Sequence, residues 1–400
     1  MQARAGPTSH SSTRFGLDRL GLVIAVLISA AIFQPFAALR PNRIAAAAPV
    51  ELWHALPFAQ WVFLCTLLQL CVLIMVVRTK ASLRFFILSI ALFSLLFLIG
   101  SSGTYLTPTD NNYARISPGG GFWFLLFALG LAIGDSVVKL KLKPVTRIAV
   151  LGIFGLGFGS ILYFGAWNDL SILKEYASYR RPFMNALSTH VMLAGGSLCL
   201  AMLIAFPVGI LIYNSPRLRE AVLSVLNVIQ TIPSMALFGV LIAPLAWVGA
   251  NLPGATALGI AGIGPAPALI ALIAYALLPI TLATVTGLAG VPSAITEAAE
   301  GIGMTRVQRL IKIEIPLAFP VILTGIRVVL VQNIGLTVIA GLVGGGGLGT
   351  FIFQGLSQTA TDLILLGALP TVAMAFSAAI ILDALIEISR GREAKSEQGL

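Results

Sequence analysis

The chain is mostly apolar, but the stretch Glu297–Pro316 combines charged residues with regularly spaced apolar residues. Such a combination suits binding to another protein. The stretch reads E-A-A-E-G-I-G-M-T-R-V-Q-R-L-I-K-I-E-I-P, and its charged side chains place it in water between two apolar runs. Pro292 and Pro316 bracket it, and a proline interrupts helical hydrogen bonding. Its apolar residues fall loosely on one helical face. They are Ile302, Val307, Leu310, Ile311 and Ile313. The pattern predicts a short helix-turn-helix on the membrane surface that is offered to a partner.

This spacing resembles the E-A-A motif, E-A-A-x3-G-x9-I-x-L-P, of the membrane subunits of ATP-binding-cassette (ABC) importers. Ile315 stands where the family has Leu. The resemblance implies that residues 289–317 form a cytoplasmic coupling loop that docks into a groove of a separate ATPase. It implies docking or capping for Glu297 and a tight turn for Gly303. The alternative is an ordinary cytoplasmic loop of another multi-span protein. The matching positions are Glu297, Ala298, Ala299, Gly303, Ile313 and Pro316.

The composition indicates a membrane protein. Of the 400 residues 58% are hydrophobic and 10% charged, whereas roughly a quarter of a soluble domain is charged. The net charge of +10 does not indicate nucleic acid binding, because the basic residues are spread between the apolar runs rather than gathered in a patch. Neither the cysteines nor the histidines have the spacing of a metal site or a disulfide framework, so we expect no metal and no cofactor. They are Cys65, Cys71, Cys199, His10, His54 and His190.

Apolar runs of about 20 residues are long enough to cross a bilayer. The sequence predicts an all-α integral membrane protein of about ten transmembrane helices. The first run could instead be a cleaved signal peptide, but its long polar leader favours a retained span. The runs are at about 20–39, 58–77, 85–100, 122–138, 148–166, 190–212, 222–248, 267–288, 318–342 and 363–388.

Polar segments divide these runs into parts. We expect a cytoplasmic tail at 1–19, an N-terminal five-span block at 20–166 and an external linker at 167–189. A permease core would follow at 190–388, with a cytoplasmic tail at 389–400. Basic residues favour the cytoplasmic side of a membrane. With both termini in the cytoplasm, 18 of the 25 Lys and Arg residues lie inside and six outside, and Arg327 lies within a span. This places the E-A-A loop in the cytoplasm independently of the resemblance.

Polar residues inside spans require a reason, because burying them in lipid is costly. In the predicted span 222–248, polar residues surround Pro233, which we expect to bend the helix near the carbonyl of Ile229. They could line a water-filled translocation path, or they could bond one helix to another. These residues are Asn227, Gln230, Thr231 and Ser234, of which Asn227, Gln230 and Ser234 would share one helix face.

Charged residues in and near other spans extend this path hypothesis. Arg327 could snorkel to the cytoplasmic face, or it could face the interior with Gln332 and Asn333. Asp383 and Glu387 are expected to pair with Arg390 or Arg392. Asp135 and Lys139, four residues apart, predict a local ion pair.

A glycine-rich run, G-G-G-G-L-G, contains the spacing G-x-G-x-x-G at Gly344, Gly346 and Gly349. It follows a membrane span rather than a strand of a βαβ unit, so it does not indicate nucleotide binding. We expect it to break the helix and shape an external gate loop. The sequence contains no G-x-x-x-x-G-K-[ST], so ATP hydrolysis is expected on a separate subunit.

The core also resembles permeases for glycine betaine, choline and carnitine, in their long form with extra N-terminal spans. Leu282 and Ala283 depart from an Arg-Asn pair that is frequent in this branch. The resemblance implies three partners, which are cytoplasmic ATPase subunits, an external or periplasmic substrate-binding protein and a second permease subunit, in the cell membrane. The alternatives are an amino-acid permease, an ion-coupled carrier or a membrane-embedded enzyme. The resemblance rests on residues 197–211, 227–237, 275–280 with Thr284, Gly287 and Leu288, and 344–356.

Overall fold

The computed structural model describes residues 18–397 apart from 44, 78 and 112, and their side chains as far as Arg390. Nearly all of the predicted tail 1–19 therefore lies outside the described residues. So do the side chains of Arg78, Arg392 and Lys395. Contacts divide the chain into two compact units. Unit 1 extends to Leu142 and includes Gly155–Leu173, and unit 2 holds Lys143–Phe154 and everything from Lys174 onward.

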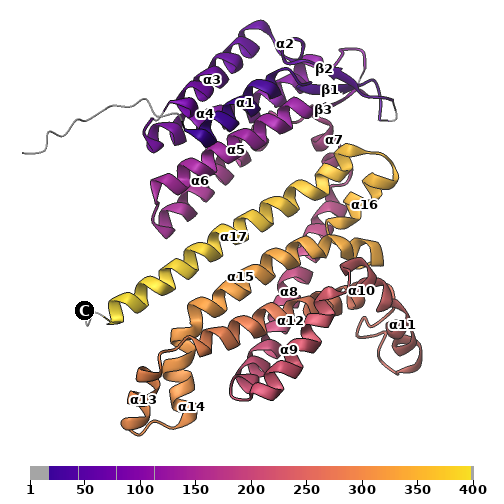
Figure 1. The fold of residues 1–400 in the computed structure, drawn as a ribbon. Helices are drawn as coiled ribbons and strands as arrows, with labels where there is room; N and C mark the ends of the chain where they lie inside the picture. Colours follow the sequence, from indigo (N-terminus) through magenta and orange to yellow (C-terminus); the bar gives the residue numbers. More distant parts are fainter. Residues whose placement is uncertain (1–17, 44, 78, 112, 398–400) are drawn as a thin grey trace, which may run out of the picture. The chain divides into compact units, whose positions relative to one another are not determined.

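Unit 1 is built on four helices that pack side by side (Figure 1). They form because long apolar segments in a bilayer must satisfy their backbone groups internally. Helix α6 (Pro144–Tyr163) belongs partly to each unit. The four helices are α1 (Arg19–Ile32), α3 (Phe58–Val76), α4 (Ala81–Leu106) and α5 (Gly120–Leu140), and the short α2 (Leu52–Ala55) precedes α3.

Unit 1 also contains a small antiparallel sheet that the sequence pattern did not predict. Its strand order is β2-β1-β3, with β1 at Ala37–Arg40, β2 at Ala48–Val50 and β3 at Arg115–Pro118. The predicted helical span 20–39 is wrong in its second half, because α1 ends at Ile32 and β1 follows. Pro35 explains the break, since it lacks an N–H and restricts the residue before it.

Charged side chains connect three helices at the end of unit 1 where α1 begins. Asp18 caps α1 and accepts hydrogen bonds from Arg84 Nη1 at 2.9 Å and Lys139 Nζ at 2.8 Å. Lys139 also contacts Asp135 at 2.7 Å, which confirms the predicted pair. Arg84 is 2% exposed and donates to the carbonyl of Val77 as well. This network connects α1, α4 and α5.

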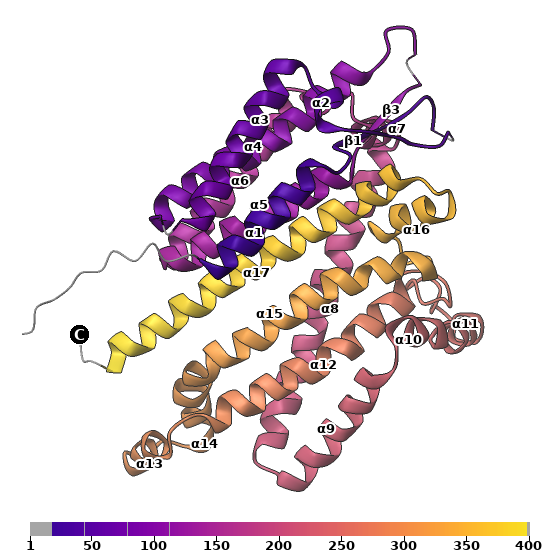
Figure 2. The same ribbon diagram turned by 45° about the horizontal axis from the view of Figure 1, so that its top comes forward.

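Unit 2 is organised around α12, which packs against α8 and α15, while α15 also packs against α17 (Figure 2). Helix α7 (Ser171–Ser178) and the start of α8 occupy the predicted linker 167–189, and α17 continues through most of the predicted tail 389–400. The helices are α8 (Arg180–Tyr213), α9 (Pro216–Thr231), α10 (Ser234–Val240), α11 (Ile242–Asn251), α12 (Pro265–Ala289), α13 (Ser293–Gly301), α14 (Arg306–Arg309), α15 (Ile315–Ala340), α16 (Gly349–Ser357) and α17 (Thr361–Glu397).

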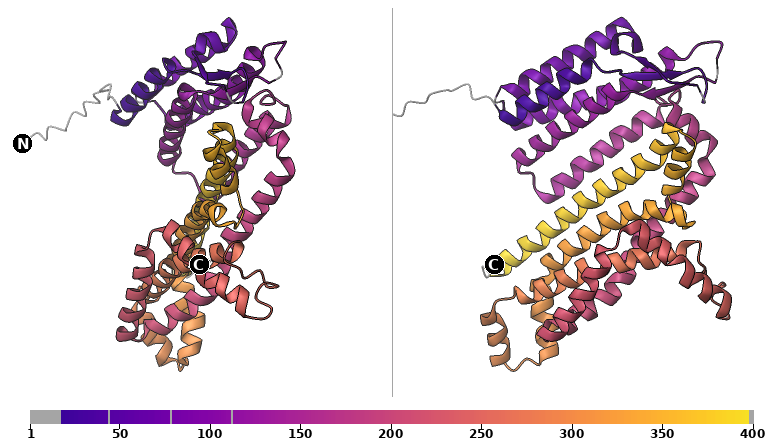
Figure 3. Two further views of the ribbon diagram at one scale, coloured as in Figure 1. Left: turned by 90° about the vertical axis from the view of Figure 1, so that its right-hand side faces the viewer. Right: turned by 45° about the vertical axis from the view of Figure 1, so that its right-hand side comes forward.

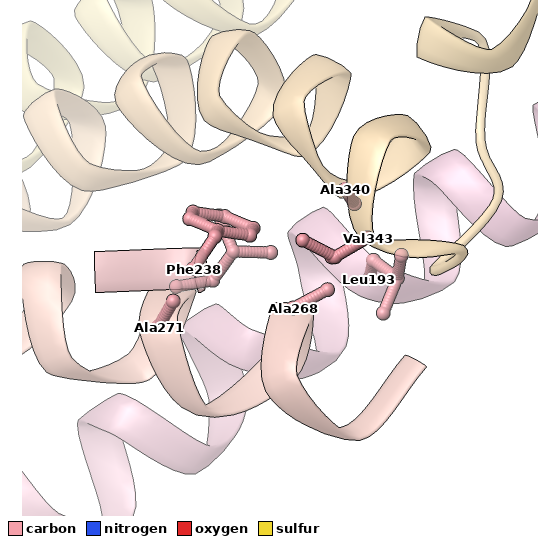
Figure 4. Packing of buried hydrophobic residues seen from close by; sticks show 7 residues of the cluster. Leu193, Phe238, Ala268, Ala271, Ala340 and Val343 are labelled. Atoms are coloured by element: carbon pink, nitrogen blue, oxygen red, sulfur yellow. The ribbon is translucent and has the colours of Figure 1, made fainter. Parts of the chain in front are cut away.

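A hydrophobic cluster packs four of these helices together (Figure 4). Phe238 of α10 is fully buried beside Ala268 and Ala271 of α12, with Leu193 of α8 and Ala340 of α15 completing the contact. Alanines let helix backbones approach closely, which suits packing within a bilayer. A second cluster continues the same interface along α8, α12 and α15.

Among the described residues, nine helical segments are long and apolar enough to cross a membrane, and α1 is a shorter apolar helix. The prediction of a multi-span helical membrane protein is therefore confirmed. A second predicted span also differs from the structure, because residues 222–248 form three helices instead of one. Pro233 separates α9 from α10 rather than bending a continuous helix, so Ser234 is not on the same helix as Asn227 and Gln230.

Candidate functional site

The predicted helix-turn-helix is present between α12 and α15, and Gly303 forms its turn. Helix α13 ends at Gly301, and Gly303 has φ +84, a left-handed conformation that favours glycine. Its N–H donates to the carbonyl of Glu300 at 2.9 Å, and the N–H of Met304 donates to that of Ala299 at 3.1 Å. These two bonds form a Schellman motif that ends the helix. The tight turn expected for Gly303 is confirmed.

Helix α14 starts from a capping box. Thr305 accepts from the N–H of Gln308, and Gln308 accepts from the N–H of Thr305. Glu297 lies inside α13 with an exposed side chain, and the cap residue of α13 is Pro292. The capping role considered for Glu297 is therefore wrong, and docking remains a proposal.

The proline at the end of the stretch does not end the helix. Residues Leu310–Glu314 form a turn of π-helix that joins α14 to α15, and the N–H of Ile315 donates to the carbonyl of Leu310. Pro316 then occupies the first turn of α15, where its missing N–H costs little. The expectation that Pro316 brackets the stretch is wrong, because the π-turn changes the hydrogen-bond register before the proline.

Arg309 connects the two short helices through ion pairs with Glu300 and Glu314, and we call this group of three residues the clasp. Arg309 Nη1 contacts Glu300 of α13, and its Nε donates to Glu314 in the π-turn. Glu314 is 3% exposed, so its carboxylate requires this partner. The motif does not include this clasp, and the sequence shows it only as three charges in one loop.

The loop presents an unpartnered apolar face. Ile302, Val307 and Ile311 are 80%, 64% and 60% exposed. Ala299 is buried within the loop, whereas Glu297 and Ala298 are exposed. In the right-hand view of Figure 3 the loop lies at one end of α12 and α15, and α10 and α11 lie at the other. Exposed apolar residues beside charges are typical of a protein interface.

The polar residues around Pro233 lie on two helices, and those with hydrogen bonds have different partners. Gln230 donates from Nε2 to the carbonyl of Tyr275 in α12 at 2.8 Å, which is a bond between helices. Thr231 donates to the carbonyl of Val228 in its own helix. Asn227 is exposed.

The charged and amide residues of α15 also have separate partners. Arg327 contacts Asp383 of α17, and Glu387 contacts Arg147 at 3.0 Å. The prediction that Asp383 and Glu387 pair with Arg390 is therefore wrong, and the side chain of Arg392, the other predicted partner, lies outside the described residues. Asn333 is fully buried and donates to Ser197 of α8 at 2.8 Å. The structure does not bring Arg327 and Asn333 together.

The glycine run ends α15, as its composition predicts. Gly344 and Gly346 have φ +76 and +79, and a side chain on Gly349 would meet the carbonyl oxygen of Val338 at 1.8 Å. His190, which the sequence did not indicate as a partner of this run, is fully buried beside it. Its Nδ1 accepts from the N–H of Leu348 at 3.2 Å, and its Nε2 lies 2.9 Å from the carbonyl of Ile334. A single histidine in an apolar run does not indicate that its side chain contacts the backbone of Leu348 and Ile334.

The fold is that of a multi-pass membrane protein with a polar helix-turn-helix between two of its long apolar helices. Comparison with known families agrees. Residues 197–394 match the family “Binding-protein-dependent transport system inner membrane component”, and residues 18–173 match “ABC transporter permease YehY, N-terminal domain”.

Individual relatives each match about half of this chain. The osmoprotectant import permease protein OsmW of Salmonella typhimurium is 40% identical over 49% of this chain and 85% of its own length. The carnitine transport permease protein OpuCB of Listeria monocytogenes is 38% identical over 46% of this chain and 78% of its own length. The choline transport system permease protein OpuBD of Bacillus subtilis is 35% identical over 53% of this chain and 87% of its own length. This chain belongs to the family of ABC importer permeases, which are inner-membrane transport subunits.

Proposed function

We propose that this permease carries glycine betaine, choline, carnitine or a related quaternary ammonium osmoprotectant into the cell. The relatives named for osmoprotectants, carnitine and choline support this cargo class. Competition tests it, since labelled choline uptake should fall in excess unlabelled glycine betaine or carnitine and persist in excess amino acids. Uptake of a labelled amino acid instead of choline would contradict the cargo and leave the permease assignment intact.

The coupling loop 289–317 is the docking element for a separate cytoplasmic ATPase. The observation that carries this role is its clasped helix-turn-helix with an exposed apolar face. Ile302, Val307 and Ile311 would enter the groove of the ATPase, and Glu297 would contact its rim. Ala299, Ile313 and Pro316 hold the shape of the loop, and Gly303 forms its turn.

Membership of the importer permease family supports the remaining roles in this proposal. An external substrate-binding protein delivers the cargo, and a second permease subunit, the same or different, completes the pathway. ATP is hydrolysed on the ATPase subunits and not on this chain. Residues 20–166 form an N-terminal block and residues 190–388 the permease core. Within the core, α9, α10 and α15 contribute to the path, and the run from Gly344 to Gly349 shapes an external gate. The candidate path residues are Asn227, Gln230, Thr231, Pro233, Ser234, Arg327, Gln332 and Asn333.

A cross-link tests the docking role directly. Cysteine at the exposed position Ala298 should cross-link to the ATPase in membranes, because that residue lies on the outer side of α13. Cysteine at Thr256, in the loop beyond α11, serves as the control and should give no such product. Equal cross-linking from both positions, or none from Ala298 in a complex that contains the ATPase, would contradict the docking role.

Removing the clasp should weaken coupling without destroying the fold. Arg309→Met leaves the buried Glu314 without its ion pair and frees α13 from α14. We expect cargo moved per ATP to fall roughly five- to tenfold, because losing one partner of a buried pair costs more than losing an exposed pair. Arg309→Lys should recover part of the loss.

Arg217→Met is the matched control, since Arg217 is an exposed arginine at the start of α9. It should leave the ratio of cargo to ATP unchanged. An unchanged ratio in Arg309→Met would show that the clasp has no part in coupling.

A further inference from the structure

Two prolines leave two backbone carbonyls without their usual helical partners. Pro279 follows Tyr275 by four residues in α12, so the N–H that would ordinarily donate to the carbonyl of Tyr275 is missing. The side chain of Gln230 supplies the missing donor at 2.8 Å. Buried backbone carbonyls need such a partner, particularly in lipid.

The second carbonyl lies at the break between α9 and α10. Helix α9 ends at Thr231, and Ile232 is extended with φ −68 and ψ 128, so its carbonyl leaves the helical ladder before Pro233. The hydroxyl of Tyr275 donates to this carbonyl at 2.5 Å. The two hydrogen bonds are reciprocal, because each side supplies a side-chain donor for a backbone carbonyl of the other.

Few side chains of the segment around this break are fully buried. Within the described residues, α9 buries only Leu226, α10 buries only Phe238 and α11 buries none. Phe238 is the buried side chain on the α10 side of the break, and it belongs to the cluster shown in Figure 4. Leu226 is the buried side chain on the α9 side. The reciprocal pair lies between them, where the chain can change direction.

We propose that Gln230 and Tyr275 form a catch that holds α9–α11 against α12, and that this segment moves about the Ile232–Pro233 break during transport. A transporter must alternate between two arrangements, and a helix break held by a few polar contacts can supply a hinge. Both are positioning residues, and the cargo need not touch them. The inference requires neither a particular cargo nor the coupling loop.

Hydrogen exchange of the complete transporter in lipid nanodiscs tests the catch. Tyr275→Phe and Gln230→Met each remove one donor while keeping the size of the side chain. We expect backbone exchange in residues 216–251 to become about five- to tenfold faster in each variant, as the loss of one hydrogen bond predicts. Exchange in α8 and α15 should stay as in the wild type. Tyr213→Phe, which removes another tyrosine hydroxyl from unit 2, is the control. It should change the exchange neither in residues 216–251 nor in α8 and α15.

A second measurement separates a catch from an ordinary structural contact. If the catch stabilises the conformation that the transporter adopts without cargo, each variant should depopulate that conformation. Both variants should then raise ATP hydrolysis in the absence of cargo. Unchanged exchange in residues 216–251 would overturn the proposal, and so would an increase spread evenly over unit 2. Faster local exchange with unchanged resting ATP hydrolysis would overturn the role in the transport cycle.

Discussion

Gly303→Pro is expected to abolish ATP-driven uptake while leaving the protein inserted in the membrane. Gly303 has φ +84, whereas proline requires a φ near −65°. Proline also removes the N–H that donates to Glu300, so the Schellman motif at the end of α13 is lost. A cost of about 3 kcal/mol or more at this turn should displace α13 from α14. We expect uptake to fall at least about 100-fold.

Uptake is measured beside the amount of inserted permease and of ATPase that copurifies with it. Gly254→Pro is the matched control, because Gly254 also has φ +84 but lies in the loop beyond α11, where an added side-chain carbon would meet nothing within 4 Å. That control should retain uptake. Normal uptake by Gly303→Pro would contradict the coupling role of the loop.

Arg84→Met should destabilise unit 1 and leave unit 2 in place. The substitution removes a buried cation that donates to Asp18 and to the carbonyl of Val77. Breaking a buried ion pair costs about 3–5 kcal/mol, and Lys139 remains beside Asp18, so we expect a loss of about 2–3 kcal/mol. This corresponds to a fall in melting temperature of about 5–10 °C for a unit of this size.

Tryptophan fluorescence can report this loss, because four of the five tryptophans lie in unit 1, at Trp53, Trp61, Trp123 and Trp167. Arg19→Met removes an exposed arginine from the same end of the unit and should leave the melting temperature unchanged. Equal melting temperatures for Arg84→Met and the wild type would contradict the role of the network.

Acid should weaken the same network. Hydrogen bonds from Lys139 and Arg84 hold the pKa of Asp18 well below its usual range. A carboxylate with a lowered pKa contributes stability in full above its unfolded pKa of about 4, and the contribution is lost as the pH falls below that value. The melting temperature of the wild type should therefore fall more steeply below about pH 4 than that of Asp18→Asn.

The spans and the helix-turn-helix between α12 and α15 could be predicted because each depends on local chemistry. Long apolar runs must become helices in a bilayer, and basic residues gather on the cytoplasmic side. Gly303 could be predicted as a turn because its neighbours form two short amphipathic helices. The motif spacing identified this loop among several polar segments.

The breaks within spans and the polar partners could not be predicted. Pro35 and Pro233 end helices that hydropathy alone would continue, since hydropathy does not register a missing backbone donor. Gln230 bonds a carbonyl 45 positions away in sequence, and Asn333 bonds Ser197 across 136 positions. Helical spacing predicts neighbours within one helix, so it could place Asp135 beside Lys139 but could not pair Asp383 with Arg327.

The most direct test of the account is uptake of labelled glycine betaine and choline by transport-deficient cells that express this permease with its neighbouring ATPase and binding protein. We predict uptake that disappears when the ATPase is made catalytically dead, and also when Gly303→Pro replaces the wild-type permease. Uptake that continues with the dead ATPase would contradict an ATP-driven mechanism and favour an ion-coupled carrier.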